Sequence, residues 1–369
     1  MPEIRADQIR LLERLCNAGA VSGDEGEVRA IVVEELTGHA DELRVDALGN
    51  VLAVRHGRRR GAPRVMLAAH MDEVGFMIVA DDGDGIFQFA TVGGIRPQLL
   101  LGKAVVVGMD HRPGVIGAAP VHLAKGNTSG EPDAQALRID LGGEGRAAIG
   151  ERAVFATRFQ RSGKAILAKA IDDRIGVATV LELTRTAPAN VELHAAFTVQ
   201  EEIGSYGAGV AAHAIDPVLA IVIESTAALD LPGSDSGDAA AYNTRLGGGP
   251  AIYVADSATV YDQRLVQWLE KAAKRGRVAY QVRQPGRGGT DGRSIQQALR
   301  GVPTVAVAVP HRYTHSPVSI ARLEDWASTL KLLQVALRDV SPGFVRSLRA
   351  RPGRAAARTP RGTRRATRR

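Results

Sequence analysis

Short apolar runs alternate with helix-length segments over most of the chain. The runs are rich in Val, Ile and Ala and are too continuous to be half-exposed strands; they cover residues 64–69, 191–199, 218–223 and 302–309. This pattern is typical of strands that are buried on both faces. Segments of helical length lie between and after them, at residues 174–186, 261–274, 292–299 and 323–340. Strands alternating with helices predict an α/β/α fold, with helices on both faces of a sheet.

The opening segment and one internal stretch do not follow this alternation of strands and helices. Residues 4–36 have apolar positions at helical spacing, interrupted by a turn at residues 21–26, and residues 43–54 alternate like two short strands around Gly49-Asn50. From about residue 73 to 163 the chain is rich in turns, and glycines recur among short Val/Ile runs. We therefore predict a small β-domain at residues 73–164, inserted into a discontinuous catalytic domain made of residues 1–72 and 165–345.

The positive charge of the chain is concentrated at its end. The 369 residues carry a formal charge of +7, but residues 346–369 contain ten arginines and no acid. Without these arginines the rest of the chain has a charge of −3, so the excess of basic residues lies in the tail. We predict that residues 346–369 are disordered. Such a tail is typical either of an arm that binds nucleic acid or an acidic partner, or of a solubilising extension.

Composition excludes several classes of protein. The hydrophobic content of 45% is ordinary for a globular protein, and no apolar run reaches the length of a membrane span. Cys16 is the only cysteine and cannot form an internal disulfide, and the first ten residues are charged rather than signal-like. We expect a cytoplasmic protein with no membrane contact.

Polar side chains that can bind metals follow the predicted strands. His70 and Asp72 come directly after the first buried run, Glu201 and Glu202 follow the second, and Glu224 follows the third. The fourth leads to His311 and His315, and Asp172-Asp173 precedes a helix that one of the two can cap. Ligand sites of open α/β sheets lie at the carboxyl ends of strands, so these side chains are expected to converge. Each is weak evidence alone, and together they indicate a cation site, because clustered carboxylates repel one another.

The ligand types narrow the choice of metal. Histidine with carboxylate, and the only cysteine far away, favours Zn²⁺, Co²⁺ or Mn²⁺. Two histidines and several acids exceed the needs of one open tetrahedral site, whereas a carboxylate-bridged pair of ions roughly 3.5–4 Å apart fits the number of ligands. Such a pair lowers the pKa of a shared water and polarises a carbonyl while a nearby acid takes the proton. The sequence therefore predicts a metal-assisted hydrolase.

Several ordered motifs carry a resemblance to a known family. They include His70-Met71-Asp72-Glu73-Val74-Gly75-Phe76-Met77, Lys169-Ala170-Ile171-Asp172-Asp173-Arg174, Thr198-Val199-Gln200-Glu201-Glu202-Ile203-Gly204, Arg312-Tyr313-Thr314-His315-Ser316-Pro317, Gly93-Gly94, Gly247-Gly248-Gly249-Pro250 and Gly289-Thr290-Asp291. From about Arg5 to Val340 the chain resembles the two-metal aminopeptidases of the glutamyl-aminopeptidase and deblocking-aminopeptidase kind, some of which were long labelled endoglucanases. The arginine-rich tail lies outside the resemblance.

The resemblance implies a role for each site residue. His70, Asp172 and Glu224 would hold one metal ion, and Asp172, Glu202 and His315 the other, with Asp172 as the bridge. Asp72 would orient the His70 imidazole, and Glu201 would be the general base. The family usually has Asp where this chain has Glu224, a longer ligand, which affects the affinity and identity of that metal. His311 is better interpreted as a hydrogen-bonded loop histidine.

The resemblance also implies the architecture and the partners. Family members combine a phosphorylase/hydrolase-like α/β/α catalytic domain with a β-barrel-like insert that serves subunit contacts, and they assemble as dimers into a tetrahedral dodecamer. We expect two ions per subunit, Zn²⁺ or Co²⁺ with Mn²⁺ as a third option, and short peptides as substrates. The preferred amino-terminal residue depends on loops at residues 226–243 and 284–291, where Asp230, Asp235, Asp238 or Arg245 could favour either charge.

Three other functions compete with this one. A glycosidase would need only two facing carboxylates, and it leaves His70 and His315 unexplained; the aromatic content of 4% also offers few surfaces for stacking sugars. A metal-dependent deacylase of small N-acyl substrates would use the same site residues. A protein that binds nucleic acid through its arginine-rich tail would show an affinity that falls steeply with salt.

Overall fold

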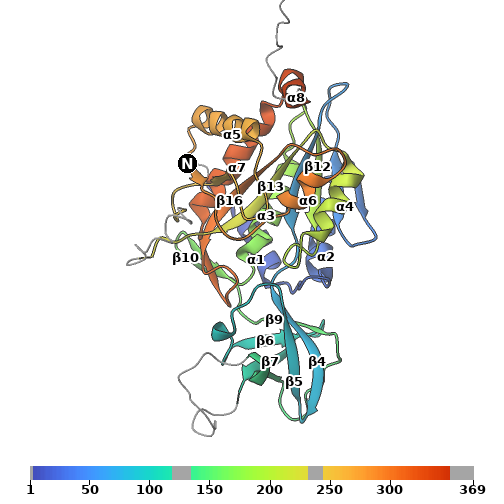
Figure 1. Cartoon of the computed structure of the whole chain (residues 1–369), viewed down its shortest axis with the longest axis vertical. Helices are drawn as coiled ribbons and strands as arrows, with labels where there is room; N and C mark the ends of the chain where they lie inside the picture. The colour runs from blue at the N-terminus through green and yellow to red at the C-terminus, as the bar shows by residue number, and fades with distance from the viewer. Residues whose placement is uncertain (1–2, 119–133, 232–243, 350–369) are drawn as a thin grey trace, which may run out of the picture.

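The computed structural model describes residues 3–118, 134–231 and 244–349. A large α/β domain lies above a smaller β-barrel in the view of Figure 1. The predicted fold class, an α/β/α domain with an inserted barrel-like domain, is confirmed. Within the described residues, no helix has the length and apolar character that crossing a membrane requires.

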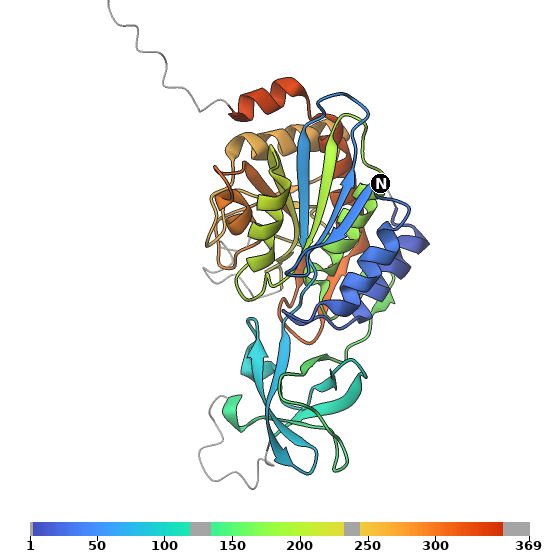
Figure 2. The ribbon, with the colours of Figure 1, turned by 90° about the vertical axis from the view of Figure 1, so that its right-hand side faces the viewer.

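The α/β domain contains the helices and most of the strands. Its helices are α1 (Ala6–Asn17), α2 (Gly26–Leu36), α3 (Ile171–Arg185), α4 (Tyr206–Ile215), α5 (Gln263–Gly276), α6 (Gly292–Gln297), α7 (Leu323–Arg338) and α8 (Pro342–Arg349). Its strands are β1 (Glu42–Val45), β2 (Val51–Arg55), β3 (Arg64–His70), β10 (Gln160–Ser162), β11 (Ala165–Ala168), β12 (Glu192–Thr198), β13 (Leu219–Ala227), β14 (Ala251–Tyr253), β15 (Gln281–Arg283), β16 (Thr304–Arg312) and β17 (Ser319–Arg322). In Figure 2, α1 and α2 lie on one side of the sheet and α4 and α6 on the other.

Four parallel strands form the centre of the mixed sheet. The strand order is β1-β2-β12-β3-β13-β16-β17-β11-β10, with β14 and β15 joined at β16. Strand β3 is parallel to both β12 and β13, and β13 is parallel to β16. The carboxyl ends of these strands therefore meet at one edge, where His70 pairs in register with Thr198 and Glu224 with Ala308.

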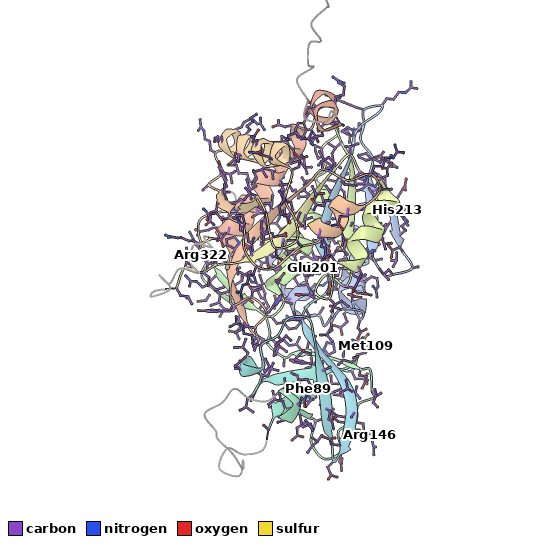
Figure 3. All side chains as sticks on the ribbon, viewed as in Figure 1. Phe89, Met109, Arg146, Glu201, His213 and Arg322 are labelled. Atoms are coloured by element: carbon purple, nitrogen blue, oxygen red, sulfur yellow. The ribbon has the colours of Figure 1, made fainter. Side chains whose placement is uncertain are left out.

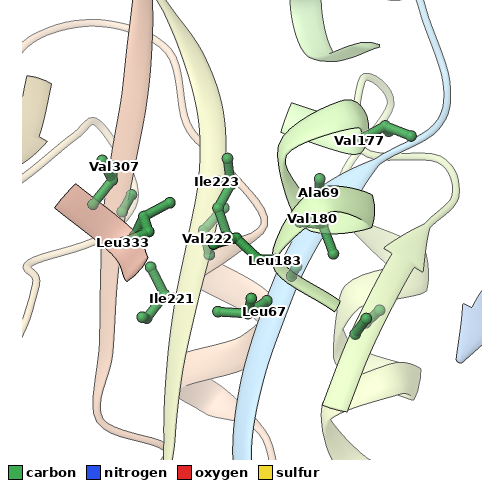
Figure 4. Packing of buried hydrophobic residues seen from close by; sticks show 14 of the residues in the cluster. Leu67, Ala69, Val177, Val180, Leu183, Ile221, Val222, Ile223, Val307 and Leu333 are labelled. Atoms are coloured by element: carbon green, nitrogen blue, oxygen red, sulfur yellow. The ribbon is translucent and has the colours of Figure 1, made fainter. Parts of the chain in front are cut away.

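The core lies between this sheet and its helices. Leu67 of β3 and Ile221 and Ile223 of β13 are fully buried in the same core as Val180 and Leu183 of α3, and Figure 4 labels all five. Burying a side chain of this size stabilises the fold by roughly 1.5–3 kcal/mol. Tight packing on both faces fixes the register of the strands, and so fixes where the side chains at their ends lie.

The inserted barrel has its own core. Its strands close in the order β4-β5-β8-β7-β6-β9, with bounds β4 Gly75–Gly83, β5 Ile86–Val92, β6 Ala104–Val107, β7 Arg112–Gly117, β8 Arg138–Asp140 and β9 Arg152–Phe155. Short 3₁₀ helices η1 (Pro97–Leu99) and η3 (Ala134–Ala136) accompany them. The Phe76 ring packs edge-on against the rings of Phe89 and Phe155, and the ring centroids are 5.2 Å apart in each pair. Gly85, at φ +75° in the β4–β5 turn, leaves no room for a Cβ beside the Gly142 carbonyl.

Two predicted boundaries, the end of the insert and the start of the tail, differ in the structure. Strand β10 already pairs with β11 in the large sheet, so the insert ends between Phe155 and Gln160 rather than at residue 164. Helix α8 continues to Arg349, past the predicted start of the tail at residue 346, because Val345 and Leu348 pack into the core. The rest of the predicted tail lies outside the described residues.

Candidate metal centre

The site residues lie at the carboxyl edge of the central strands. His70 ends β3, Glu224 lies in the carboxyl-terminal half of β13, and Glu201 and Glu202 follow β12. Asp172 lies at the start of α3, and His315 follows β16. Figure 3 places Glu201 in the part of the α/β domain that is nearer the barrel. The structure thus brings all seven predicted site residues to one edge of the sheet.

His70 is surrounded by carboxylates. Its Nδ1 lies 3.2 Å from the Asp72 carbonyl oxygen, which can only accept, so Nδ1 carries the proton. Its Nε2 lies 3.3 Å from Asp172 Oδ1 and 3.4 Å from Glu224 Oε1. Burial lowers the pKa of His70, but Glu224 and Asp172 outweigh it and raise the pKa well above the usual value. A positive charge is therefore favoured between these three groups.

His315 repeats this arrangement on the other side of Asp172. Its Nδ1 lies 3.0 Å from the Gly94 carbonyl oxygen, to which it donates, so Nε2 is left facing Glu202 Oε2 at 3.1 Å and Asp172 Oδ2 at 3.7 Å. Burial lowers the pKa of His315, but Glu202 outweighs it and raises the pKa to about 9. Because each oxygen of Asp172 faces a different imidazole, Asp172 lies between two candidate cation positions.

Asp173 is a buried carboxylate that sequence reasoning gave no place in the metal site. Its Oδ1 accepts the Gly176 N–H at 3.0 Å, as expected for a helix cap, while its buried Oδ2 has no hydrogen-bond partner among the described residues. The peptide bond between Asp172 and Asp173 is cis. Burial and the nearby Glu224 carboxylate raise the pKa of Asp173 well above its usual value. We call the six side chains His70, Asp172, Asp173, Glu202, Glu224 and His315 the acidic cluster.

The acidic cluster fits divalent cations. Ligand atoms of His70, Asp172 and Glu202 lie within 4.8 Å of one another, and so do those of His70, Asp173 and Glu224. Burial raises the pKa of Glu224 to about 8 and also raises that of Glu202. At pH 7 Glu224 therefore holds a proton that a cation would displace on binding. Imidazole and carboxylate donors with one orphaned oxygen match Zn²⁺, Co²⁺ or Mn²⁺.

Asp72 holds more than the histidine that it was predicted to orient. Its Oδ1 lies 3.4 Å from His70 Nδ1 and accepts the Glu201 N–H at 3.0 Å. Its Oδ2 accepts the Glu202 N–H at 3.1 Å and the Ser22 hydroxyl at 2.6 Å. One carboxylate therefore fixes the end of β3 to the turn that carries both glutamates.

Glu201 lies beside the acidic cluster and has a hydrogen-bond partner of its own. The Ser205 hydroxyl donates to its Oε1 at 3.3 Å. Burial and the neighbouring Glu224 carboxylate raise the pKa of Glu201 well above its usual value. A carboxylate with a raised pKa is a stronger base, as proton transfer near neutral pH requires.

A second group of buried charges lies next to the acidic cluster and is fully paired. Glu73 Oε1 accepts from Lys169 Nζ at 2.7 Å and from Arg174 Nη2 at 2.9 Å. Lys169 also donates to the Ala18 carbonyl at 2.7 Å, and Arg174 to that of Leu15 at 3.1 Å. We call Glu73, Lys169 and Arg174 the Glu73 cluster.

A cavity of about 620 Å³ opens beside the acidic cluster. Its lining includes His70, Asp172, Glu201, Glu202, Glu224 and His315. A larger cavity of about 1050 Å³ lies at the opposite edge of the same strands, lined by residues such as Arg64, Val218 and Thr304, and contains none of the site residues. The smaller cavity is therefore the candidate substrate site.

The four residues that were predicted to influence substrate specificity lie in different parts of the protein. Asp230 is paired with Arg312 at 2.6 Å, and Arg245 is exposed and outside the cavity lining. Asp235 and Asp238 lie outside the described residues. Sequence reasoning missed Tyr253 and Arg283, which do line the cavity; their strands, β14 and β15, are too short to give a pattern.

His311 is hydrogen-bonded, as predicted, but it lies in a strand rather than in a loop. Its Nε2 is 3.2 Å from the Ser225 hydroxyl and 2.8 Å from that of Thr314, and its buried Nδ1 has no partner in the described part of the chain. Burial lowers the pKa of His311 to about 4. It therefore stays neutral at physiological pH and serves as a packed polar residue.

Comparisons with known proteins find similar aminopeptidases. The sequence profile described as M42 glutamyl aminopeptidase matches residues 49–332. The chain is 33% identical over 347 residues to a lysyl aminopeptidase of Pyrococcus furiosus, covering 90% of this chain and 97% of the relative.

The solved structures that resemble this chain also include an aminopeptidase and a peptidase. An aminopeptidase from Desulfurococcus kamchatkensis has 32% identity and a TM-score of 0.88, covering 94% of this chain and 98% of that one. The TET1 peptidase of Pyrococcus horikoshii, which can assemble into a tetrahedron or a large octahedral shell, has 31% identity and a TM-score of 0.78, covering 89% of this chain and 98% of that one.

Proposed function

Since the chain belongs to the M42 glutamyl aminopeptidase family and is thereby a peptidase, we propose that it removes amino-terminal residues from short peptides with two divalent cations. His70, Asp172 and Glu224 would hold one cation. Asp172, Glu202 and His315 would hold the other. The observation that carries the proposal is the position of Asp172, whose two oxygens face two different imidazoles. The donor set favours Zn²⁺ or Co²⁺, with Mn²⁺ as a third candidate.

The chain's own residues would supply positioning and proton transfer. When bound, the cations supply Lewis acidity, which lowers the pKa of a water and polarises the scissile carbonyl. Glu201 accepts the proton of the attacking water on its carboxylate and returns it to the leaving amine. The Ser205 hydroxyl at 3.3 Å from Oε1 limits the rotation of that carboxylate.

Two carbonyl oxygens would set the tautomers of the ligand histidines. The Asp72 and Gly94 carbonyls accept from Nδ1 of His70 and His315, so that both Nε2 lone pairs face the cation positions. Asp72 also holds the backbone of Glu201 and Glu202, which keeps the base and a ligand at a fixed spacing from His70. Asp72 is therefore proposed as the residue that positions the site.

We also propose that the protein assembles through its barrel into dimers and a dodecamer. Met109 and Ile149 of the barrel are 67% and 73% exposed, as expected for side chains that a partner subunit would cover. The similarity to the TET1 peptidase supports the same assembly here. Light scattering should give a mass twelve times that of the 39.0 kDa chain. The lone Cys16, a buried free thiol, is consistent with the cytoplasmic location that we propose.

The test begins with protein stripped of metal and then supplied with Zn²⁺, Co²⁺ or Mn²⁺. Release of amines from amino-acid anilides should require a cation, and Glu201→Gln should lower kcat by about 10²–10⁴-fold without preventing cation binding. Glu144→Gln, at an exposed glutamate of the barrel, is the matched control and should retain full activity. Turnover of N-acetylated amino acids alone would replace the aminopeptidase with a deacylase. No turnover with any cation would overturn the proposal.

A further inference from the structure

We infer that one end of the α/β domain is a docking surface for the phosphate backbone of double-stranded nucleic acid. The surface consists of the cavity of about 1050 Å³ at the opposite edge of the central strands and of the arginines around it, and we call it the basic end. It shares no residue with the acidic cluster, so the inference does not depend on the proposed function.

Segments that are far apart in the sequence bring arginines to the basic end. The arginines that line the cavity come from β3, α5, the segment after α6, and α8; they are Arg64, Arg264, Arg300 and Arg346. Residues 61–63 also line it, and three consecutive arginines at residues 58–60 directly precede them in the β2–β3 loop. Figure 1 and Figure 2 both show this loop and α8 at the end of the α/β domain that lies away from the barrel. A loop of three arginines therefore borders a cavity that contains four.

The positive charge of the basic end is only partly compensated. The lining contains two acids, and each is already paired with an arginine. Asp216 lies 3.4 Å from Arg64, and Asp262 lies 2.5 Å from Arg264. The other five arginines are exposed, and their side chains form no hydrogen bond or ion pair in the part of the chain that the structure describes; they are Arg58, Arg59, Arg60, Arg300 and Arg346. These five side chains are available to an anion that arrives from outside.

The arginine-rich tail begins at the same end of the domain. Helix α8 ends at Arg349, and residues 350–369 add eight arginines and no acid. Residues 1–345, by contrast, have a net charge of −3. Positive charge is therefore concentrated at one place on an otherwise acidic protein, and such a field attracts polyanions over a distance.

The type of cation favours phosphate as the ligand. All the cations in the described lining are arginines, whose planar guanidinium groups bind phosphate oxygens with two parallel hydrogen bonds. The same lining contains no aromatic residue. Protein interfaces are enriched in aromatic anchors, and single-stranded nucleic acids stack their bases on aromatic side chains. A duplex, whose phosphates can be contacted without reading its bases, is the partner that fits.

Strand β3 separates the basic end from the acidic cluster. Arg64 begins this strand and His70 ends it, so the two ends are about 20 Å apart along it. A duplex on the basic end leaves the cavity beside the acidic cluster open. Binding should therefore be the same for stripped and for cation-loaded protein.

Fluorescence anisotropy with a labelled DNA duplex of about 20 base pairs measures this binding without any need for peptidase activity. The affinity of the wild-type chain should fall by roughly 10²-fold between 50 and 200 mM salt, as about four phosphate contacts would give. The double variant Arg300→Gln/Arg346→Gln should lose about half of this salt dependence, because it lacks two of the contacts. The triple variant of the loop, Arg58→Gln/Arg59→Gln/Arg60→Gln, should also bind more weakly at every salt concentration.

The matched control removes the same charge elsewhere. The double variant Arg44→Gln/Arg146→Gln changes two exposed arginines, one on β1 and one on the barrel, where Figure 3 labels Arg146. It should keep the affinity and the salt dependence of the wild type. An equal loss in this control and in Arg300→Gln/Arg346→Gln would show that net charge alone matters and would overturn the inference.

Other probes separate the duplex from its competitors. An RNA duplex of the same length should also bind, because both duplexes present phosphates, and failure of both at about 50 mM salt would overturn the inference. Equally tight binding of poly-L-glutamate of the same charge would identify an acidic protein as the partner instead. Tighter binding of a single strand than of the duplex would contradict the choice of partner. Wild-type affinity in both surface variants would assign the binding to the tail alone.

Discussion

The acidic cluster and the Glu73 cluster are neighbours in the fold and differ in how their polar atoms are paired. In the Glu73 cluster one carboxylate meets two cations, and backbone carbonyls accept further donors. In the acidic cluster four carboxyl groups share two imidazoles, and Asp173 Oδ2 has no partner in the described part of the chain. Burial alone therefore does not identify a functional site. A buried polar atom that its neighbours leave unpaired is the better indicator, because buried polar groups with a purely structural role are hydrogen-bonded.

The largest effect is expected from breaking the fully paired Glu73 cluster. Glu73→Gln would leave Lys169 and Arg174 buried without a counter-charge, which should lower the free energy of unfolding by about 3–5 kcal/mol. Denaturant unfolding of the stripped protein measures the change. Glu34→Gln is the control, because its ion pair with Arg14 is largely exposed, and it should change stability by less than about 1 kcal/mol. Equal effects of the two variants would contradict the comparison.

Cation binding should have the opposite effect at the acidic cluster, raising the stability. Adding Zn²⁺ to stripped protein at a hundred times its Kd should raise the stability by about 2.7 kcal/mol, seen as a higher Tm. Binding should also release protons at pH 7, because the pKa of His315 and that of Glu224 are raised to about 9 and about 8. Calorimetry in buffers with different ionisation enthalpies counts these protons. Binding without proton release would show that the cation occupies another site.

The neutral His311 provides a pH test beside the cluster. Burial lowers its pKa to about 4, so between pH 6.5 and pH 4 the unfolded chain binds a proton that the folded chain does not. Stability contributed by this group is therefore lost as the pH falls through that window, by up to about 3 kcal/mol. His311→Gln should reduce the fall by a similar amount in unfolding curves recorded from pH 7 to pH 4. His213→Gln, at an exposed histidine, should follow the wild-type curve.

The smallest effect is expected from relieving repulsion inside the acidic cluster. Asp173→Asn keeps the oxygen that accepts the Gly176 N–H and removes a charge that burial and Glu224 disfavour. The stripped variant should be more stable than the wild type by about 1 kcal/mol at pH 7. Asp84→Asn, at an exposed turn of the barrel, is the neutral control. A loss of stability in Asp173→Asn would mean that the surroundings stabilise the Asp173 carboxylate.

The sequence pattern predicted the central sheet because its strands are buried on both faces and contain little but Val, Ile, Leu and Ala. It did not predict α4 (Tyr206–Ile215), since glycines and alanines give that helix no apolar stripe. It also missed the β4–β5 hairpin, because the acids and glycines of this hairpin are typical of turns. These elements depend on tertiary packing rather than on local periodicity.

The candidate site was predictable where it depends on strand ends. His70, Glu202, Glu224 and His315 could be named because the ends of parallel strands must share an edge. The contact of Arg283 with Thr226 spans 57 residues and depends on how β15 is placed beside β14. The two backbone N–H groups held by Asp72 also come from a turn that no local pattern describes. Such contacts follow from the assembled fold alone.

The position of the barrel has a consequence for the order of folding. It interrupts the large sheet between β3, which ends at His70, and β10, which begins at Gln160. In an unfolded chain these roughly ninety residues form a loop whose closure costs conformational entropy. A barrel that first condenses around Phe76, Phe87 and Phe155 shortens this loop to the few residues at its two junctions. The insert would then act as a folding nucleus, and weakening its core should slow the refolding of the distant catalytic sheet.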